Sequence, residues 1–117
     1  MALTRTRQEL AVAVMRELGK IGADETPTSD DATYVKAAYD DKYEWWVDEE
    51  LVYWEPDEIP KAVFQAVRDI IINEVRGAFG EPTPAEEKSA REDLLMKRLR
   101  RHTARATSGM RTEAEYF

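Results

Sequence analysis

The sequence predicts an all-α protein: a small bundle of four helices with one short extended segment and an extended C-terminal arm. Apolar residues recur at spacings of three and four in four separate segments, which is the period of an amphipathic helix. Thr or Pro precedes these segments, as expected of helix starts. Only residues 51–55 favour a strand, and we interpret this run as a connector across the bundle or as an edge that a partner can pair with. We therefore expect a helical domain over residues 1–103 and an arm over residues 104–117.

The first helix is predicted over residues 5–18, with Thr4 or Thr6 as its cap, and Thr6 and Glu9 have the spacing of a capping box. Its buried stripe is Leu10, Ala11, Val14 and Leu18. Arg7 falls in the same stripe, and we expect it to form a buried ion pair with Glu74, because a carboxylate in a core needs a partner. In the alternative, Arg7 reaches solvent and Glu74 pairs with an arginine of the last helix.

The second helix is predicted over residues 29–49 and starts at Thr28. It carries two apolar stripes. The wider stripe is Ala32, Val35, Tyr39, Tyr43 and Trp46. The narrower stripe contains Tyr34, Ala38 and Trp45, and a helix with two apolar stripes contacts more than one neighbour. Tyr34 and Trp45 are therefore candidates for a subunit interface, and the alternative is that Trp45 lies flat on its own domain.

The third helix, residues 60–79, is the most apolar segment, and we expect the other helices to pack on it. Gly80 follows it and suits a helix stop. Two residues break its pattern, since Glu74 projects into the apolar face and Ile72 projects from the opposite, polar face. An isoleucine among charges can mark a second packed surface, so Ile72 joins the candidate subunit interface.

The fourth helix is predicted over residues 84–103, with a thin apolar stripe and a basic end that complements the helix dipole. The stripe is Leu95, Met96, Leu99 and His102. Residues 104–117 lack helical periodicity, and we predict an extended arm that orders on a partner. Aromatic side chains at a free end are typical anchors for a partner groove. The candidate anchoring residues are Met110, Arg111, Tyr116 and Phe117.

Charge and composition disfavour several classes of function. The 117 residues carry a net charge of −7, which argues against a general nucleic-acid binder. Residues 21–60 hold 13 acidic and two basic side chains, a net charge of −11. The chain has no Cys and one His, His102, so neither a disulfide nor a His-rich or thiolate metal site is expected. No apolar run or signal-peptide pattern indicates a membrane or secreted protein. We expect no enzyme activity, metal or cofactor.

The order of the motifs resembles that of a known family. A first helix capped by Thr4 ends in Glu-Leu-Gly at residues 17–19, and residues 22–28 (Gly-Ala-Asp-Glu-Thr-Pro-Thr) lead into the second helix. Asp-Glu-Ile-Pro at residues 57–60 opens the apolar helix, which ends in Ala-Phe-Gly at residues 78–80. A charged last helix then leads to Glu-Tyr-Phe at residues 115–117. Over nearly the whole chain, this order resembles the tail accessory factors of short-tailed bacteriophages, also called head-to-tail adaptor or connector proteins.

The resemblance implies a helical bundle that attaches, in about twelve copies, beneath the portal ring of a filled phage head. Such a ring would extend the DNA channel, let DNA pass without specific binding, and offer a platform for the next tail protein (nozzle or tube). The C-terminal arm would anchor the ring to the portal protein. The protein would then lie in the head–tail neck of the virion, and in the host cytoplasm during assembly, with no membrane partner.

In such a ring, we expect the acids of residues 40–58 to point away from subunit contacts, toward the lumen or the distal end, since clustered like charges repel. The residues of this acidic face are Asp40, Asp41, Asp48, Glu49, Asp57 and Glu58.

Two other classes of function compete with the adaptor. An acidic helical protein could mimic DNA and bind a basic partner, as a monomer or dimer whose binding is salt-sensitive. A small hydrolase would need a carboxylate pair that faces a cleft, with the pKa of one member raised. Glu74 is the one acid expected to be buried, and it has no obvious second carboxylate.

Overall fold

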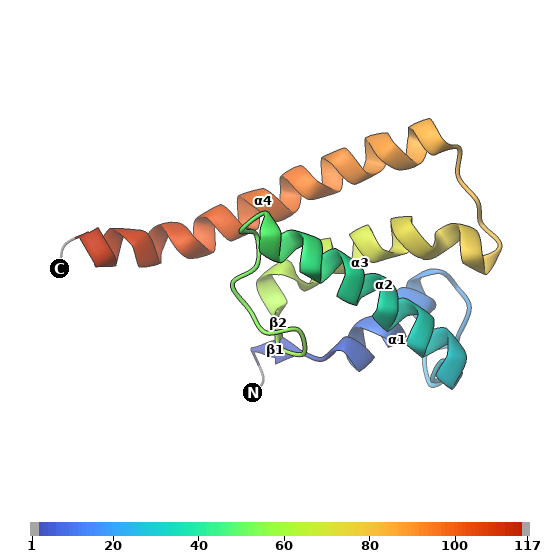
Figure 1. The fold of residues 1–117 in the computed structure, drawn as a ribbon. Coiled ribbons are helices and arrows are strands. Elements are labelled where there is room, and N and C mark those ends of the chain that lie inside the picture. Colours follow the sequence, from blue (N-terminus) through green and yellow to red (C-terminus); the bar gives the residue numbers. More distant parts are fainter. Residues whose placement is uncertain (1–2, 116–117) are drawn as a thin grey trace.

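The computed structural model describes residues 3–115 of the chain, with side chains over residues 3–107. Within this part, four helices, one 3₁₀ turn and one two-stranded sheet form a bundle from which the C-terminal helix projects (Figure 1). The elements in chain order are β1 (Thr4–Arg5), α1 (Arg7–Glu17), α2 (Ser29–Asp48), β2 (Ile59–Pro60), α3 (Lys61–Val75), η1 (Arg76–Phe79) and α4 (Ala85–Glu115). The predicted fold class, an all-α bundle of four helices, is confirmed.

The helices α1 and α2 start at predicted cap residues, and for α1 the cap is Thr6 and not Thr4. Thr6 Oγ1 accepts a hydrogen bond from the Glu9 N–H at 3.1 Å, and Glu9 Oε1 accepts one from the Thr6 N–H at 3.1 Å. These two bonds complete the predicted capping box at the start of α1. Thr28 Oγ1 accepts from the Asp31 N–H at 3.2 Å and starts α2 in the same way. After α3, the turn η1 ends at Gly80, which has a φ of +86°, a conformation that favours glycine.

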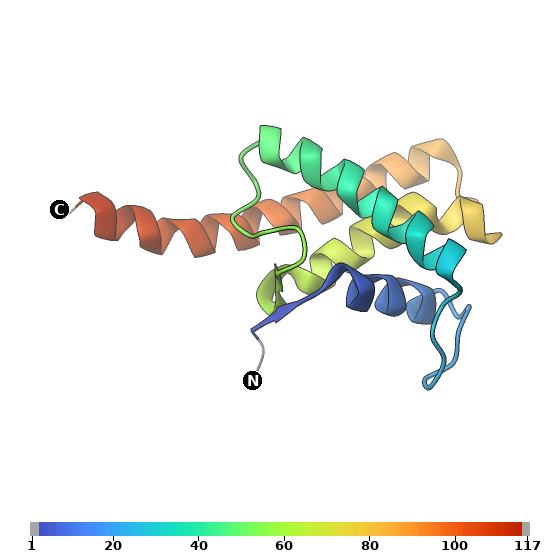
Figure 2. The same cartoon turned by 60° about the horizontal axis from the view of Figure 1, so that its bottom comes forward.

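The helix α3 lies at the centre of the bundle, and α1, α2 and α4 all pack on it (Figure 2). Its buried residues surround more than half of the helix: Val63, Ala66, Val67, Ile70, Ile71, Ile72, Asn73 and Val75. The predicted central role of this segment is confirmed, and α2 contributes the largest fully buried side chains, Trp46 and Tyr39.

Ile72 corrects one prediction about the surface. Its side chain is 5% exposed and belongs to the core, so it cannot serve in a subunit interface. The second packed surface that Ile72 marks is covered by the chain's own α4. Next to it, Asn73 Nδ2 donates to the Lys88 carbonyl of α4 at 3.0 Å. The polar pattern of this face of α3 misled the prediction because the backbone of a neighbouring helix accepts from the Asn73 amide nitrogen, and this polar side chain can therefore be buried.

The connector over residues 51–55 is not a strand. Leu51 and Trp54 are buried, so this segment crosses the bundle as a connector. Of the two expected alternatives, a connector and an edge for a partner strand, the structure has the connector. The sheet consists instead of β1 and β2, which pair antiparallel with Thr4 opposite Pro60 and Arg5 opposite Ile59. Strands of two residues are too short to show an alternating pattern, so the sequence gives no signal for them.

The C-terminal segment differs from the expected extended arm. The last helix was predicted to end at residue 103, whereas α4 continues as a helix to Glu115. Figures 1 and 2 both show the C-terminal turns of α4 projecting beyond the rest of the bundle. Adding a residue to a formed helix needs no new nucleation, and Ala, Arg, Met and Glu all favour helix, so an apolar stripe is not required there.

Among the described residues, no helix is long and apolar enough to cross a membrane.

Candidate interaction surface

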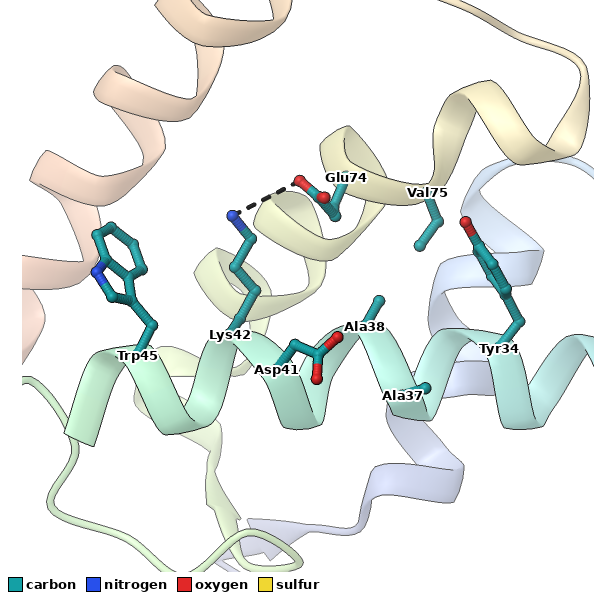
Figure 3. Close-up of a pocket in the computed structure, with 8 residues that line it drawn as sticks. All are labelled: Tyr34, Ala37, Ala38, Asp41, Lys42, Trp45, Glu74 and Val75. Atoms are coloured by element: carbon teal, nitrogen blue, oxygen red, sulfur yellow. Dashed lines mark ion pairs between the residues drawn. The ribbon is translucent and has the colours of Figure 1, made fainter. Parts of the chain in front are cut away.

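An open groove of about 420 Å³ lies between α2 and the C-terminal part of α3 (Figure 3). Two predicted interface residues of α2, Tyr34 and Trp45, lie at its opposite ends and are 49% and 42% exposed. Ala38 and Val75 add apolar surface between them. Half-exposed aromatic side chains on a concave surface are a common feature of protein–protein contacts. This groove is the best candidate for a binding surface within the described residues.

Lys42 forms the polar part of the groove and joins three helices. Its Nζ lies 3.6 Å from Glu74 Oε2 of α3, and it also pairs with Glu92 of α4. The ammonium lies 5.7 Å from the centre of the Trp45 ring, within cation–π range. Its side chain is only 17% exposed. Lys42 therefore fixes the position of α2 relative to α3 and α4, and it orients Trp45 at the edge of the groove.

The predicted Arg7–Glu74 ion pair is wrong. Glu74 pairs with Lys42 and, at 3.7 Å, with Lys88 of α4. Arg7 lies at the start of α1, beside the turn that precedes α3, whereas Glu74 lies near the end of α3. The periodicity of a helix predicts which face of that helix a residue lies on. It does not predict which end of one helix lies beside which end of another, and the Arg7–Glu74 pair depended on that.

Arg7 instead holds two residues of the predicted acidic face. Its Nη1 lies 3.1 Å from both carboxylate oxygens of Asp40. Its backbone N–H donates to Asp57 Oδ1 at 2.9 Å, and its Nε approaches the same oxygen at 3.4 Å. Hydrogen bonding and charge attraction from Asp40 raise the pKa of Arg7. The backbone hydrogen bond from Arg7 lowers the pKa of Asp57, with smaller contributions from its guanidinium. Asp40 and Asp57 are thus engaged within the chain.

The other four acids predicted for this face are exposed: Asp41, Asp48, Glu49 and Glu58. Asp41 lies in the wall of the groove, on the same helix as Tyr34 and Trp45. Glu44, which the prediction did not name, is also exposed on α2. The solvent-facing side of α2 therefore has a negative potential next to exposed aromatic rings.

A buried hydrogen-bond network holds the connector on α2. The Tyr39 hydroxyl donates to the Pro56 carbonyl at 3.0 Å and accepts from Trp54 Nε1 at 3.1 Å. The Tyr43 hydroxyl donates to the Trp54 carbonyl at 2.6 Å. Burial raises the pKa of Tyr39 well above the ordinary tyrosine value. The aromatic stripe of α2 thus has two roles, packing on α3 and binding the backbone of the connector, and only the first is evident from its spacing.

The predicted anchoring residues lie at or beyond the limit of the described structure. Met110 and Arg111 belong to the last turns of α4, in a part whose side chains are not described. Tyr116 and Phe117 lie outside the described residues. Their role as portal anchors remains a prediction.

Within the described residues, no group of three or more His, Cys, Asp or Glu side chains could hold a metal ion. No protein-family model, no curated protein and no solved structure matches the chain. The exposed aromatic and charged side chains of α2 form a surface of the kind that occurs in protein–protein contacts.

Proposed function

We propose that the chain is a head-to-tail adaptor of a short-tailed bacteriophage. Copies of the protein form a ring beneath the portal, extend the DNA channel and present an attachment platform for the next tail protein. The ring has about twelve copies, as the family resemblance implies. The role is structural, without catalysis, and the protein acts in the neck of the virion after assembly in the host cytoplasm.

The projection of α4 carries this proposal. The buried stripe of α4 reaches Thr103, whose hydroxyl donates to the Leu51 carbonyl at 2.9 Å, and the helix continues to Glu115 beyond the bundle. A helix without neighbours of its own chain gains little packing energy. An anchor that reaches along a larger partner accounts for this length, and Met110, Arg111, Tyr116 and Phe117 are its proposed contacts with the portal.

The groove and the acidic side chains support the ring. Tyr34 and Trp45 offer apolar contact to a neighbouring copy. Asp48, Glu49 and Glu58 are exposed and would face the lumen or the distal end, where they repel DNA phosphates and let the DNA slide. Asp40 and Asp57 are already bound by Arg7, so they contribute less negative potential than the sequence suggests.

Co-sedimentation with the portal ring encoded beside its gene tests the proposal. Three chains are compared: the full-length chain, a chain that ends at Thr103, and a chain in which residues 104–117 are replaced by an Ala-rich helix of equal length. We expect stoichiometric binding by the full-length chain and none by the other two. Binding that survives both changes would move the anchor to the bundle, and no binding by any chain would contradict the adaptor function.

The competing acidic-mimic function makes a different prediction for the same preparation. It requires a monomer or dimer that binds a basic protein and dissociates when salt is added. If the portal does not bind the full-length chain, a screen with basic nucleic-acid-binding proteins at low and high salt would show whether the acids of α2 serve that role instead.

A further inference from the structure

The solvent-facing side of α2 carries a stripe of three acids. Asp41, Glu44 and Asp48 are exposed and follow one another at spacings of three and four residues, so they share one face of the helix. Within the described residues, none of the three takes part in an ion pair. Tyr34 and Trp45 lie along the same side, at the two ends of the groove.

The helix α4 carries a stripe of opposite charge. Leu94, Lys97, Arg101 and Arg105 are exposed and follow one another at spacings of three, four and four residues. Leu94 is 67% exposed, so it offers an apolar contact at the start of this stripe. Within the described residues, no ion pair involves Lys97, Arg101 or Arg105. The opposite side of α4 is the one that packs on the bundle, through Met96, Leu99 and Thr103.

We propose that the basic stripe of α4 in one copy packs along the acidic stripe of α2 in a second copy, with the two helices parallel. The residue spacings match in this orientation. Tyr34 precedes Asp41 by seven residues, and Leu94 precedes Arg101 by seven, so each pair spans about 10.5 Å of helix. When Arg101 lies at Asp41, Leu94 lies at Tyr34.

The same register brings further groups together. Arg105 follows Arg101 by four residues, which places it level with Glu44 and Trp45, the third and fourth residues after Asp41. A guanidinium there meets a carboxylate and the exposed part of an indole ring, and both contacts are favourable. An antiparallel arrangement with Arg101 at Asp41 would separate Leu94 from Tyr34, so the apolar residues favour the parallel one.

A second copy of the chain is the partner that these observations favour. In its own chain, α4 is fixed to α3 and to the connector by the Asn73 and Thr103 hydrogen bonds, and its basic stripe lies on the side away from that core. Each copy carries one acidic and one basic stripe. Contacts between unlike surfaces are heterologous, and they close into rings when the rotation allows it. The inference rests on the proposed adaptor function and names its subunit contact, which moves both Asp41 and Asp48 from the acidic lumen or distal face to that contact.

Exposed charge pairs are weak one by one and are screened by salt. The contact is therefore expected to be weak between two free copies and to strengthen on the portal, where neighbouring copies are held at high effective concentration. Free chains are expected to associate at low ionic strength and at protein concentrations approaching about 1 mM.

A charge swap in the full-length chain tests the inference. Sedimentation equilibrium measures self-association at about 20 mM and about 500 mM salt, and the indole N–H signal of Trp45 in NMR spectra reports the contact directly. We expect Asp41→Arg and Arg101→Asp each to weaken association at low salt by about tenfold or more, because each creates like-charge contacts. The chain that carries both changes has both stripes altered in a complementary way, and it should recover most of the association.

Arg100→Asp is the matched control, since Arg100 is exposed and adjacent to Arg101 but lies outside the stripe. It should leave both the association and the Trp45 signal nearly unchanged. The inference is overturned if the wild-type chain does not self-associate, if the double change brings no recovery, or if Arg100→Asp acts like Arg101→Asp.

Portal co-sedimentation of the same variants separates this inference from the proposed function. If Arg101→Asp binds the portal as completely as the wild type and the charge swap shows no recovery, the inference fails and the adaptor function stands. If the charge swap restores self-association but no chain binds the portal, the contact between copies stands and the adaptor function fails.

Discussion

The Tyr39 hydroxyl is the most connected polar group of the core. It donates to the Pro56 carbonyl and accepts from the Trp54 indole, so it joins α2 to the connector. We predict that Tyr39→Phe lowers the free energy of unfolding by about 1–3 kcal/mol, because it leaves the buried Trp54 indole N–H and the partly buried Pro56 carbonyl without their partner. Urea unfolding measures the change. Tyr34→Phe is the control and should change stability by less than about 0.5 kcal/mol, since Tyr34 is half exposed. Equal effects of the two changes would contradict the network.

The contact between Arg7 and Asp57 leads to a second prediction about single residues, which concerns how the stability of the fold depends on pH. The folded state lowers the pKa of Asp57 below its ordinary value of 3.8, so the contact stabilises the fold above that pH and this contribution is lost as pH falls through the lowered pKa. Replacing Arg7 with Gln removes the guanidinium but keeps the backbone N–H that is the main cause of the lowered pKa, so the pKa of Asp57 should rise only part of the way toward its ordinary value.

An NMR titration of the Asp57 carboxyl carbon measures this shift. Arg5→Gln removes the same charge two residues away, where Arg5 pairs with Glu9, and it should leave the titration of Asp57 nearly unchanged. An unchanged Asp57 midpoint in the Arg7→Gln chain would show that the Arg7 guanidinium does not contribute to the lowered pKa.

Local and long-range contacts of single residues differ in how well the sequence predicts them. The Thr6–Glu9 capping box was predicted correctly because both partners lie within one helical turn, where spacing alone decides the contact. The Arg7–Glu74 pair was predicted wrongly because it joins two helices. Which side chains meet between helices depends on how the helices rotate and slide against each other, and periodicity does not specify either.

At the scale of elements, Thr103 holds the midpoint of α4 on the connector. Its hydroxyl donates to the Leu51 carbonyl, whereas the Thr107 hydroxyl one turn later donates to the Thr103 carbonyl of its own helix. We predict that Thr103→Val destabilises the fold by about 1–2 kcal/mol, because the buried Leu51 carbonyl loses its donor. Thr107→Val is isosteric and equally β-branched, and it should have a much smaller effect. Thermal unfolding followed by circular dichroism compares the two, and a similar loss from both would contradict a specific Thr103–Leu51 contact.

The helices were predictable wherever a cap and an apolar stripe coincide. Thr6 and Thr28 were correct starts for α1 and α2, and the apolar run of α3 was correctly placed at the centre. The end of α4 was not predictable in this way. Its last turns lack an apolar stripe, so amphipathicity ends at Thr103 while helix propensity continues.

At the scale of the whole molecule, the sequence predicted part of the candidate site. Tyr34 and Trp45 were correctly placed at the surface, because they form a second stripe that one core cannot bury. Ile72 was wrongly placed there, since α4 covers a face of α3 that looks polar in the sequence. The groove itself was not predictable, because its shape depends on how Lys42 bridges α3 and α4.

The distribution of charge also belongs to this scale. Acids gather on the exposed side of α2, and bases gather on the exposed side of α4 after Asp93. A chain with one acidic and one basic face can bind copies of itself head to tail. A chain with the same net charge spread evenly over its surface lacks this complementarity.

Electron cryomicroscopy of the portal ring mixed with the full-length chain tests the adaptor function most directly. The account predicts a closed ring of copies beneath the portal, with the C-terminal end of each α4 against the portal and its basic stripe along α2 of the next copy. A portal ring without added density, or copies bound singly with the α2 groove open to solvent, would contradict it.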